Sequence, residues 1–162
     1  MRPTSRGEIK LKSNKPSDAP SIQFNYMQTE HDLNEMRDGI EIARDIFNQR
    51  AFDEYRGKEL SPGIQEKSKE SINEFIRNKG DTAYHPSCTC KMGNDESSVV
   101  NEELKVYGID KLRVVDASIM PNIITGNLNA ATVMIAEKAS DLILRRSPLE
   151  LEEHNFYRAN YN

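Results

Sequence analysis

The sequence contains no tryptophan, only two cysteines and no long hydrophobic run. Hydrophobic residues account for 36% of its 162 residues, whereas ordinary globular domains contain about 45–50% apolar residues. Its apolar stretches are far shorter than the roughly 20 residues that a membrane-spanning helix needs, so no membrane span is expected. The shortage of apolar residues predicts a small core and a surface that packs against further polypeptide.

The charge pattern lacks any concentration of one sign. The chain has 22 basic and 26 acidic residues, which gives a net charge of −4. They are mixed along the sequence without the basic stripe that neutralises phosphates, so no nucleic-acid partner is expected. The basic N-terminus lacks the apolar core of a signal peptide. Cys88 and Cys90 are too close for an unstrained disulfide, so we expect an intracellular, reducing location.

Hydrophobic periodicity predicts both strands and helices. Polar and apolar residues alternate over 7–12 and 21–26, which predicts two strands joined by a loop rich in Ser and Pro. Apolar residues three and four apart predict a first helix capped by Thr29, a second over about 66–78 that stops at Gly80, and a third over 129–144. Short strands are predicted at 98–100, 104–107 and 112–115. The predicted class is α+β.

The stretch YHPSCTCKMG at 84–93 contains a histidine and both cysteines. A structural zinc site needs four ligands, but no further Cys exists, and the two other histidines lie at a helix start and in the C-terminal tail. We therefore expect no metal. A catalytic cysteine would need an oriented base, and no such partner is evident. Cys88 and Cys90 are thus interpreted as packing residues. On these residues alone, His85 is better explained as a buried, hydrogen-bonded histidine than as a functional residue.

Two stretches carry a specific resemblance when they are taken together. HPSCTCKMG is followed by LRVVDASIMPNIITGNLNAATVMIAEKASDLI at 112–143, and SRGEIKLKS, IQFNYM and YRGKELSPG lie upstream. This arrangement resembles the C-terminal portion of the glucose–methanol–choline (GMC) oxidoreductases, which are FAD-dependent alcohol oxidases and dehydrogenases. The resemblance covers about 3–145. It implies the α+β C-terminal part of a flavoprotein, a sheet with flanking helices whose last helix packs on the FAD-binding domain.

The resemblance also assigns residues to the reaction. It implies that choline is oxidised to betaine aldehyde, with hydride transfer to N5 of FAD and the hydroxyl proton taken by His85 as catalytic base. A free histidine titrates near pH 6.5, which suits that task. Asn129 is implied as a second catalytic residue that orients the substrate. The residues implied to contact FAD are Asp116, Ala117, Asn127, Asn129, Ala130 and Ala131. Without the resemblance, Asp116 is equally well a turn carboxylate.

The resemblance implies two segments. Residues 1–80 would form a substrate-side α+β segment, and residues 81–146 a catalytic segment that returns to the FAD-binding domain. Residues 147–162 lack a pattern and are expected to form a disordered tail. The fingerprint G-x-G-x-x-G for FAD occurs nowhere in the sequence, and no cage of aromatics with a carboxylate is present to hold a trimethylammonium group. We therefore expect the chain to be a C-terminal part that lacks its FAD-binding partner segment and to be inactive alone.

Several alternatives stay open at this stage. One is a truncated, non-catalytic fragment or interaction module whose partner chain supplies the FAD fingerprint, and another is a small Cys/His metal protein. The electron acceptor is either oxygen or a respiratory quinone. The expected location is accordingly the cytoplasm or, through that acceptor, the periphery of the inner membrane.

Overall fold

The computed structural model describes residues 2–147, 149, 150 and 152. His154 and most of the predicted disordered tail lie outside the described residues. The elements are, in order, β1 (Glu8–Lys10), β2 (Ser21–Gln23), α1 (Glu30–Phe47), the 3-10 helix η1 (Arg50–Phe52), α2 (Lys69–Lys79), the 3-10 helix η2 (Ala117–Ile119) and α3 (Asn129–Leu144). Three helices and a two-stranded sheet confirm the predicted α+β class, and α3 has the predicted bounds.

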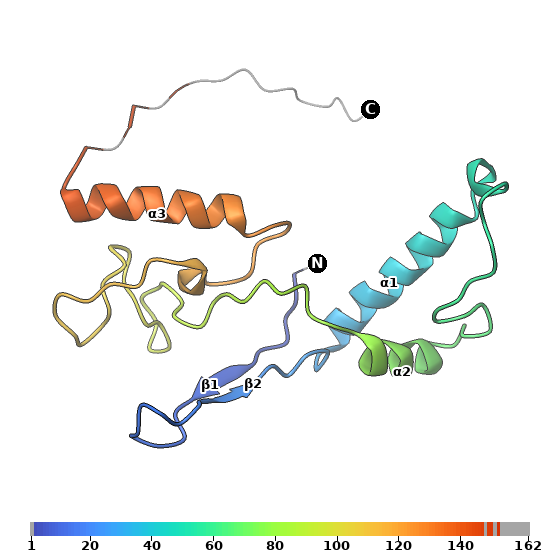
Figure 1. Ribbon diagram of the computed structural model, residues 1–162, viewed down its shortest axis with the longest axis horizontal. Coiled ribbons are helices and arrows are strands. Elements are labelled where there is room, and N and C mark those ends of the chain that lie inside the picture. The colour runs from blue at the N-terminus through green and yellow to red at the C-terminus, as the bar shows by residue number, and fades with distance from the viewer. Residues whose placement is uncertain (1, 148, 151, 153–162) are drawn as a thin grey trace.

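Helices α1 and α2 begin at polar caps and pack against each other (Figure 1). The Thr29 hydroxyl accepts a hydrogen bond from the Asp32 N–H at the start of α1, as predicted. Ser68 caps α2 by accepting from the Ser71 N–H, so this helix begins three residues later than predicted. Gly80 ends it as predicted. The helices bury a first hydrophobic cluster between them, composed of Leu33, Ile72 and Ile76.

A second hydrophobic cluster lies under α3. It consists of Val100, Leu104, Ile119 and Ala139, and Val100 is completely buried. Between residues 98 and 115 the structure has isolated β-bridges in place of the predicted strands. These bridges join Val100 to Val106 and Lys105 to Arg113. The prediction of regular strands here is wrong because the chain reverses every few residues. Leu104, Gly108 and Lys111 have φ values of 64°, 75° and 61°, which a continuous strand does not contain.

The predicted N-terminal strands form a short antiparallel hairpin. Ile9 of β1 lies opposite Ile22 of β2, and these side chains are 51% and 52% exposed. The hairpin projects from the rest of the molecule (Figure 1). Its apolar face is therefore available to further polypeptide. Within the described chain, no helix is both long and apolar enough to cross a membrane.

Residues 2–6, which we call the N-terminal strap, run from the hairpin along the start of α1 (Figure 1). Asp32 is 2% exposed and anchors the strap. Its carboxylate accepts hydrogen bonds from the Thr4 N–H at 2.7 Å, the Ser5 N–H at 2.9 Å and the Thr4 hydroxyl at 3.0 Å. Burial alone would raise the pKa of Asp32, but these bonds from Ser5 and Thr4 outweigh burial and hold it well below 3.8.

We expect Asp32→Asn to lower the free energy of unfolding by about 2 kcal/mol, because an amide NH2 would face a backbone donor and a charge-assisted acceptor would be lost. Urea unfolding followed by circular dichroism measures this change. The exposed Asp38, on the same helix, provides the matched control Asp38→Asn. Since folding lowers the pKa of Asp32, its contribution is complete above the unfolded-state pKa of about 4 and is lost as the pH falls below it. Equal losses in both variants would contradict the anchor.

Candidate functional site

The stretch that contains His85 is positioned by backbone pairing with η2. The N–H groups of Cys88, Cys90 and Met92 donate to the carbonyl oxygens of Ala117, Ser118 and Ile119, at 3.3, 2.9 and 2.7 Å respectively. Two segments that lie about thirty residues apart in the sequence therefore run side by side. One carries His85, and the other carries Asp116 and leads to α3.

The backbone around His85 follows an uncommon path. Tyr84 and Cys88 have φ values of 57° and 71°, in the left-handed region that non-glycine residues rarely occupy. Pro86 follows the histidine directly, and a residue before proline is restricted to extended conformations. Left-handed non-glycine residues cost about 1–3 kcal/mol each and gather at functional sites. The path thus holds His85 in a defined position between two turns.

The ring of His85 reaches the start of α3. Its Nδ1 accepts a hydrogen bond from the backbone N–H of Leu128 at 3.4 Å. The donor belongs to the backbone, so Nδ1 can only act as acceptor, and the neutral ring then carries its proton on Nε2. Leu128 is itself buried, with 7% exposure. The half-buried histidine is therefore oriented by a residue 43 positions away.

The N-terminus of α3 offers unbonded donors beside this histidine. No side chain caps the helix, and its first turn has no acidic residue. In the described chain, the N–H groups of Asn129, Ala130 and Ala131 have no hydrogen-bond partner. Free amides and the helix dipole stabilise negative charge at such an end. The donor set therefore fits an electron-rich cofactor such as FAD.

The other predicted site residues lie at the start of η2 or at the start of α3. Asp116 is exposed and accepts a hydrogen bond from the Ser118 N–H at 2.7 Å, so one carboxylate oxygen caps η2. The carbonyl of Ala117 accepts from Cys88. Asn127, Asn129 and Ala130 are exposed, and in the described structure the side chain of Asn129 bonds to no other residue. Asn129 directly follows Leu128, so the structure brings it to the neighbourhood of His85.

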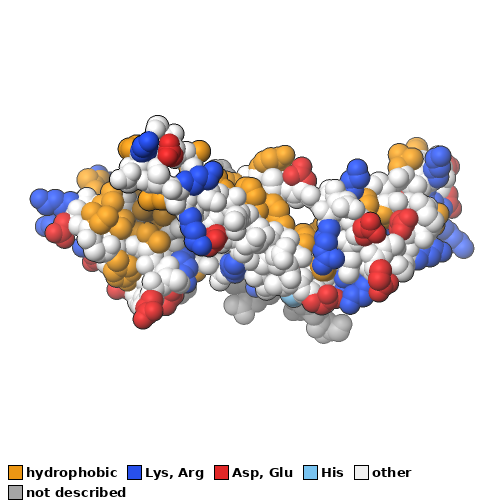
Figure 2. All heavy atoms as spheres, turned by 90° about the horizontal axis from the view of Figure 1, so that it is seen from below, with side chains coloured by type: hydrophobic (Ala, Val, Ile, Leu, Met, Phe, Trp, Pro, Cys, Tyr) orange, Lys and Arg blue, Asp and Glu red, His pale blue; other side chains and the backbone are white. Residues whose placement is uncertain are grey.

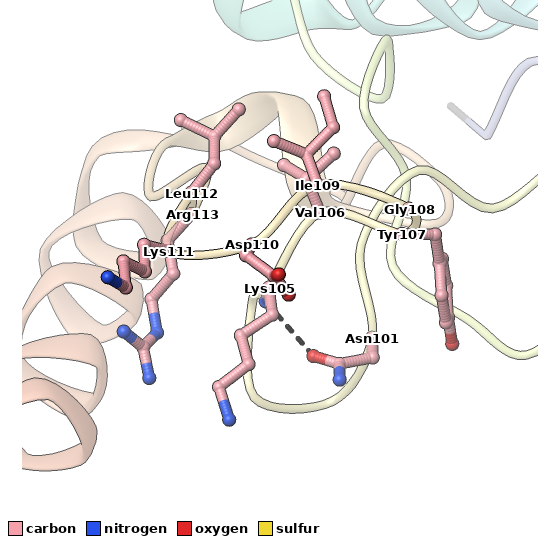
Figure 3. A pocket seen from close by; sticks show the side chains of 10 residues that line it. All are labelled: Asn101, Lys105, Val106, Tyr107, Gly108, Ile109, Asp110, Lys111, Leu112 and Arg113. Carbon is pink, nitrogen blue, oxygen red and sulfur yellow. Dashed lines mark hydrogen bonds between the residues drawn. The ribbon is translucent and has the colours of Figure 1, made fainter.

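A separate pocket of about 260 Å³ lies between residues 101 and 113. Figure 3 shows Lys105, Lys111 and Arg113 extending to one side of it, and Val106, Ile109 and Leu112 extending to the other. None of the predicted site residues lines this pocket. It is therefore distinct from the His85 site.

Comparison with known proteins identifies the family. A family model described as GMC oxidoreductase matches residues 3–136. The chain belongs to the GMC oxidoreductase family. The resemblance that the two stretches carry is thus confirmed, and with it the interpretation of the fold as that of the C-terminal domain of this family.

Relatives within the GMC family agree with this assignment. The chain is 56% identical over 159 residues to an oxygen-dependent choline dehydrogenase from Pseudomonas fluorescens, and 54% identical over 157 residues to one from Pectobacterium carotovorum. These matches cover 98% and 97% of the chain but 28% of each relative. The chain thus spans somewhat more than a quarter of the length of these relatives.

Solved GMC structures share the fold. Pyridoxine 4-oxidase from Mesorbium loti superposes with a TM-score of 0.83 at 35% identity, over 91% of this chain and 29% of that one. An FAD-dependent oxidoreductase from Chaetomium thermophilum gives a TM-score of 0.84 at 31% identity, over 89% of this chain and 25% of that one. The arrangement of helices and loops described above is therefore one that flavoproteins use.

Sequence reasoning missed Leu128, whose contribution is a backbone N–H. One signal was available, because leucine is a poor N-cap compared with Ser, Thr, Asp or Asn. An apolar residue at the start of a long helix leaves the first amides free for another acceptor. The acceptor itself was not evident, since His85 lies 43 positions away.

We predict that neutral His85 carries its proton on Nε2. Nitrogen-15 NMR of labelled imidazole rings measures this directly, because protonated and unprotonated ring nitrogens give well-separated signals. The His85 signals are assigned as those that disappear in His85→Gln. The exposed His31 lies within 3.9 Å of Glu35 and provides a comparison ring with no backbone donor at Nδ1. A predominantly Nδ1-protonated His85 would contradict the contact with Leu128.

Proposed function

We propose that this chain carries the catalytic segment of an FAD-dependent dehydrogenase that oxidises choline to betaine aldehyde. The contact between the Leu128 N–H and Nδ1 of His85 carries the proposal, because it joins the histidine to the free amides at the start of α3. The substrate is suggested by the choline dehydrogenases that are 54–56% identical over nearly the whole chain. The assignment of the site thus rests on this contact, and the choice of choline as substrate rests on the relatives.

Several residues would hold the cofactor. Asp116 and Ala117 would lie along its chain between flavin and adenine, and Asn127 with residues 129–131 would face the flavin with their amides. FAD, when bound, supplies the acceptor for the hydride that leaves the substrate carbon. The exposure of Asp116, Asn127, Asn129 and Ala130 leaves these groups accessible to a ligand.

His85 would orient the substrate hydroxyl and then accept its proton. With its proton on Nε2, the ring donates a hydrogen bond to the alcohol oxygen and orients it. To accept the hydroxyl proton, Nε2 must first be unprotonated, which requires the ring proton to move to Nδ1 through exchange with water. The contact to Leu128 opposes this change only weakly, because 3.4 Å is long for an N–H donor. His85 can therefore serve first as an orienting group and then as the base.

Asn129 would complete the substrate site. Its amide has no partner in the described structure, so it is free to donate to the alcohol oxygen and accept from the substrate. An amide does not take a proton at neutral pH. The division of labour is therefore proton transfer at His85 and orientation at Asn129.

We infer that the FAD fingerprint is supplied by polypeptide outside these 162 residues, since G-x-G-x-x-G is not found among them. Exposed apolar side chains on α3 support an additional packing surface, with Val133 at 53% and Met134 at 66% exposure. Figure 2, which is seen from below, shows further hydrophobic side chains gathered around a hollow in the same half of the molecule, on the face away from α3. Residues 1–80 would then form the substrate-side segment, and residues 81–146 the segment that returns to the FAD-binding domain.

In the intact, flavin-loaded enzyme, we predict that His85→Ala slows flavin reduction by choline about 10²–10⁴-fold, the usual range for loss of a general base. Stopped-flow absorbance at the flavin band measures the rate, and the absorbance of the purified enzyme measures flavin content. The content should change little, because the implied cofactor contacts are with other residues.

His31→Ala is the matched control, since His31 lies exposed in the first turn of α1. It should leave both quantities unchanged. An unaltered rate of flavin reduction in His85→Ala would overturn the assignment of His85. Flavin reduction by other small alcohols but not by choline would overturn the substrate and leave the reaction type intact.

A further inference from the structure

The loop that leads into α3 has little support of its own. Residues 121–127 are all exposed except Ile123, which is half-buried. Within the described chain, the single hydrogen bond that these residues make is from Nη2 of Arg6 to Oδ1 of Asn122, at 2.5 Å. A hollow of about 550 Å³ separates the N-terminal strap from residues 122–125. Side-chain packing therefore contributes little across this gap, and the bond from Arg6 bridges it.

Arg6 is held so that it reaches across. Its Nη1 donates to the carbonyl oxygens of Pro3 and Ser5, at 2.8 and 3.0 Å, which fixes the guanidinium against the strap. Its own carbonyl accepts from the Asn25 side chain at 3.1 Å. The next residue, Gly7, lies so close to β2 that an added Cβ would be 2.2 Å from the Gln23 carbonyl oxygen. The backbone at Arg6 thus has a fixed position.

The strap is in turn fixed to the first half of the molecule. Asp32 of α1 holds the backbone N–H groups of Thr4 and Ser5. Among the described residues, the bond between Arg6 and Asn122 is the one hydrogen bond that joins residues 2–80 to residues 81–147. A connected series therefore runs from the buried carboxylate of α1, through Arg6, to the loop beside His85.

We propose that Arg6 is a positioning residue for the His85 site and that it acts through Asn122. Asn122 precedes by six residues the Leu128 amide that orients the ring, and Gly126, with a φ of 87°, lies between them. When Arg6 holds Asn122, the loop keeps Leu128 against Nδ1. When this bond is lost, the loop is free to move and the ring loses the contact that orients it, so the rate falls because Nε2 no longer faces the substrate oxygen. This inference rests on the proposed function of His85.

The test uses the intact, flavin-loaded enzyme with Arg6→Ala, Asn122→Ala and the double variant. Each single variant should lower the limiting rate of flavin reduction by choline about tenfold with little change in flavin content. The double variant should be no slower than either single one, because all three remove the same bond. Arg6→Lys should retain part of the rate, and added guanidinium ion should restore it in Arg6→Ala but not in Asn122→Ala.

Arg56→Ala is the matched control. Arg56 likewise donates to a backbone carbonyl, that of Phe47, and to a side chain, that of Asp53, but it lies in the segment after η1. It should leave the rate unchanged. Nitrogen-15 NMR provides a readout that a loss of stability alone would not move. The signals of the His85 ring should shift towards a mixture of tautomers in Arg6→Ala and Asn122→Ala, and remain as in the unmodified enzyme in Arg56→Ala.

Three results would overturn the proposal: unchanged rates in both single variants, single effects that multiply in the double variant, or unaltered ring signals. If Arg6→Ala loses its flavin through misfolding, Asn122→Ala at the exposed loop decides the question instead. The proposed function is judged separately by His85→Ala. A slow His85→Ala with normal Arg6→Ala and Asn122→Ala would refute the positioning role alone, whereas a normal His85→Ala would refute the function on which it rests.

Discussion

The backbone pairing between residues 88–92 and η2 is the interaction on which the candidate site depends. It holds two segments side by side, so that His85 at the end of one meets the start of α3 beyond the other. Its three hydrogen bonds use only main-chain atoms. The partly buried Cys88 and Cys90 lie in this pairing. They contribute their backbone N–H groups to the geometry, while the chemistry is assigned to the histidine.

The helical elements could be predicted from sequence because their signals are local. Thr29, Ser68 and Gly80 provide caps and a stop within one turn of the helices they delimit. The strands over 98–115 could not be predicted in the same way. Their β-branched residues have high strand propensity, but left-handed turns at Leu104 and Lys111 break the pairing into single bridges. Local propensity does not predict such turns when the residue with positive φ is not glycine.

The candidate site shows the same contrast between residues with local sequence signals and residues that depend on long-range contacts. His85 and Asn129 could be predicted as site residues because they lie in motifs with a specific spacing, and such motifs are recognisable in the sequence without the fold. Leu128 contacts His85 through a main-chain donor, and the bond between Arg6 and Asn122 spans more than a hundred residues. Their proposed roles depend on which segments become neighbours in the fold, and neither composition nor periodicity predicts those neighbours. Asp32 is intermediate, because the helix predicted to start after Thr29 contains it, whereas the sequence does not predict the strap that it binds.

The two hydrophobic clusters also bear on the order in which the molecule assembles. Leu33, Ile72 and Ile76 come from one continuous stretch of the chain, and Val100, Leu104, Ile119 and Ala139 come from the next. Each cluster can therefore form from its own stretch without waiting for the other, as separate cooperative units do. The contact between strap and loop has a far larger sequence separation, and closing it costs more chain entropy. Folding would thus produce two preformed halves first, and the His85 site would gain its final geometry only when they dock.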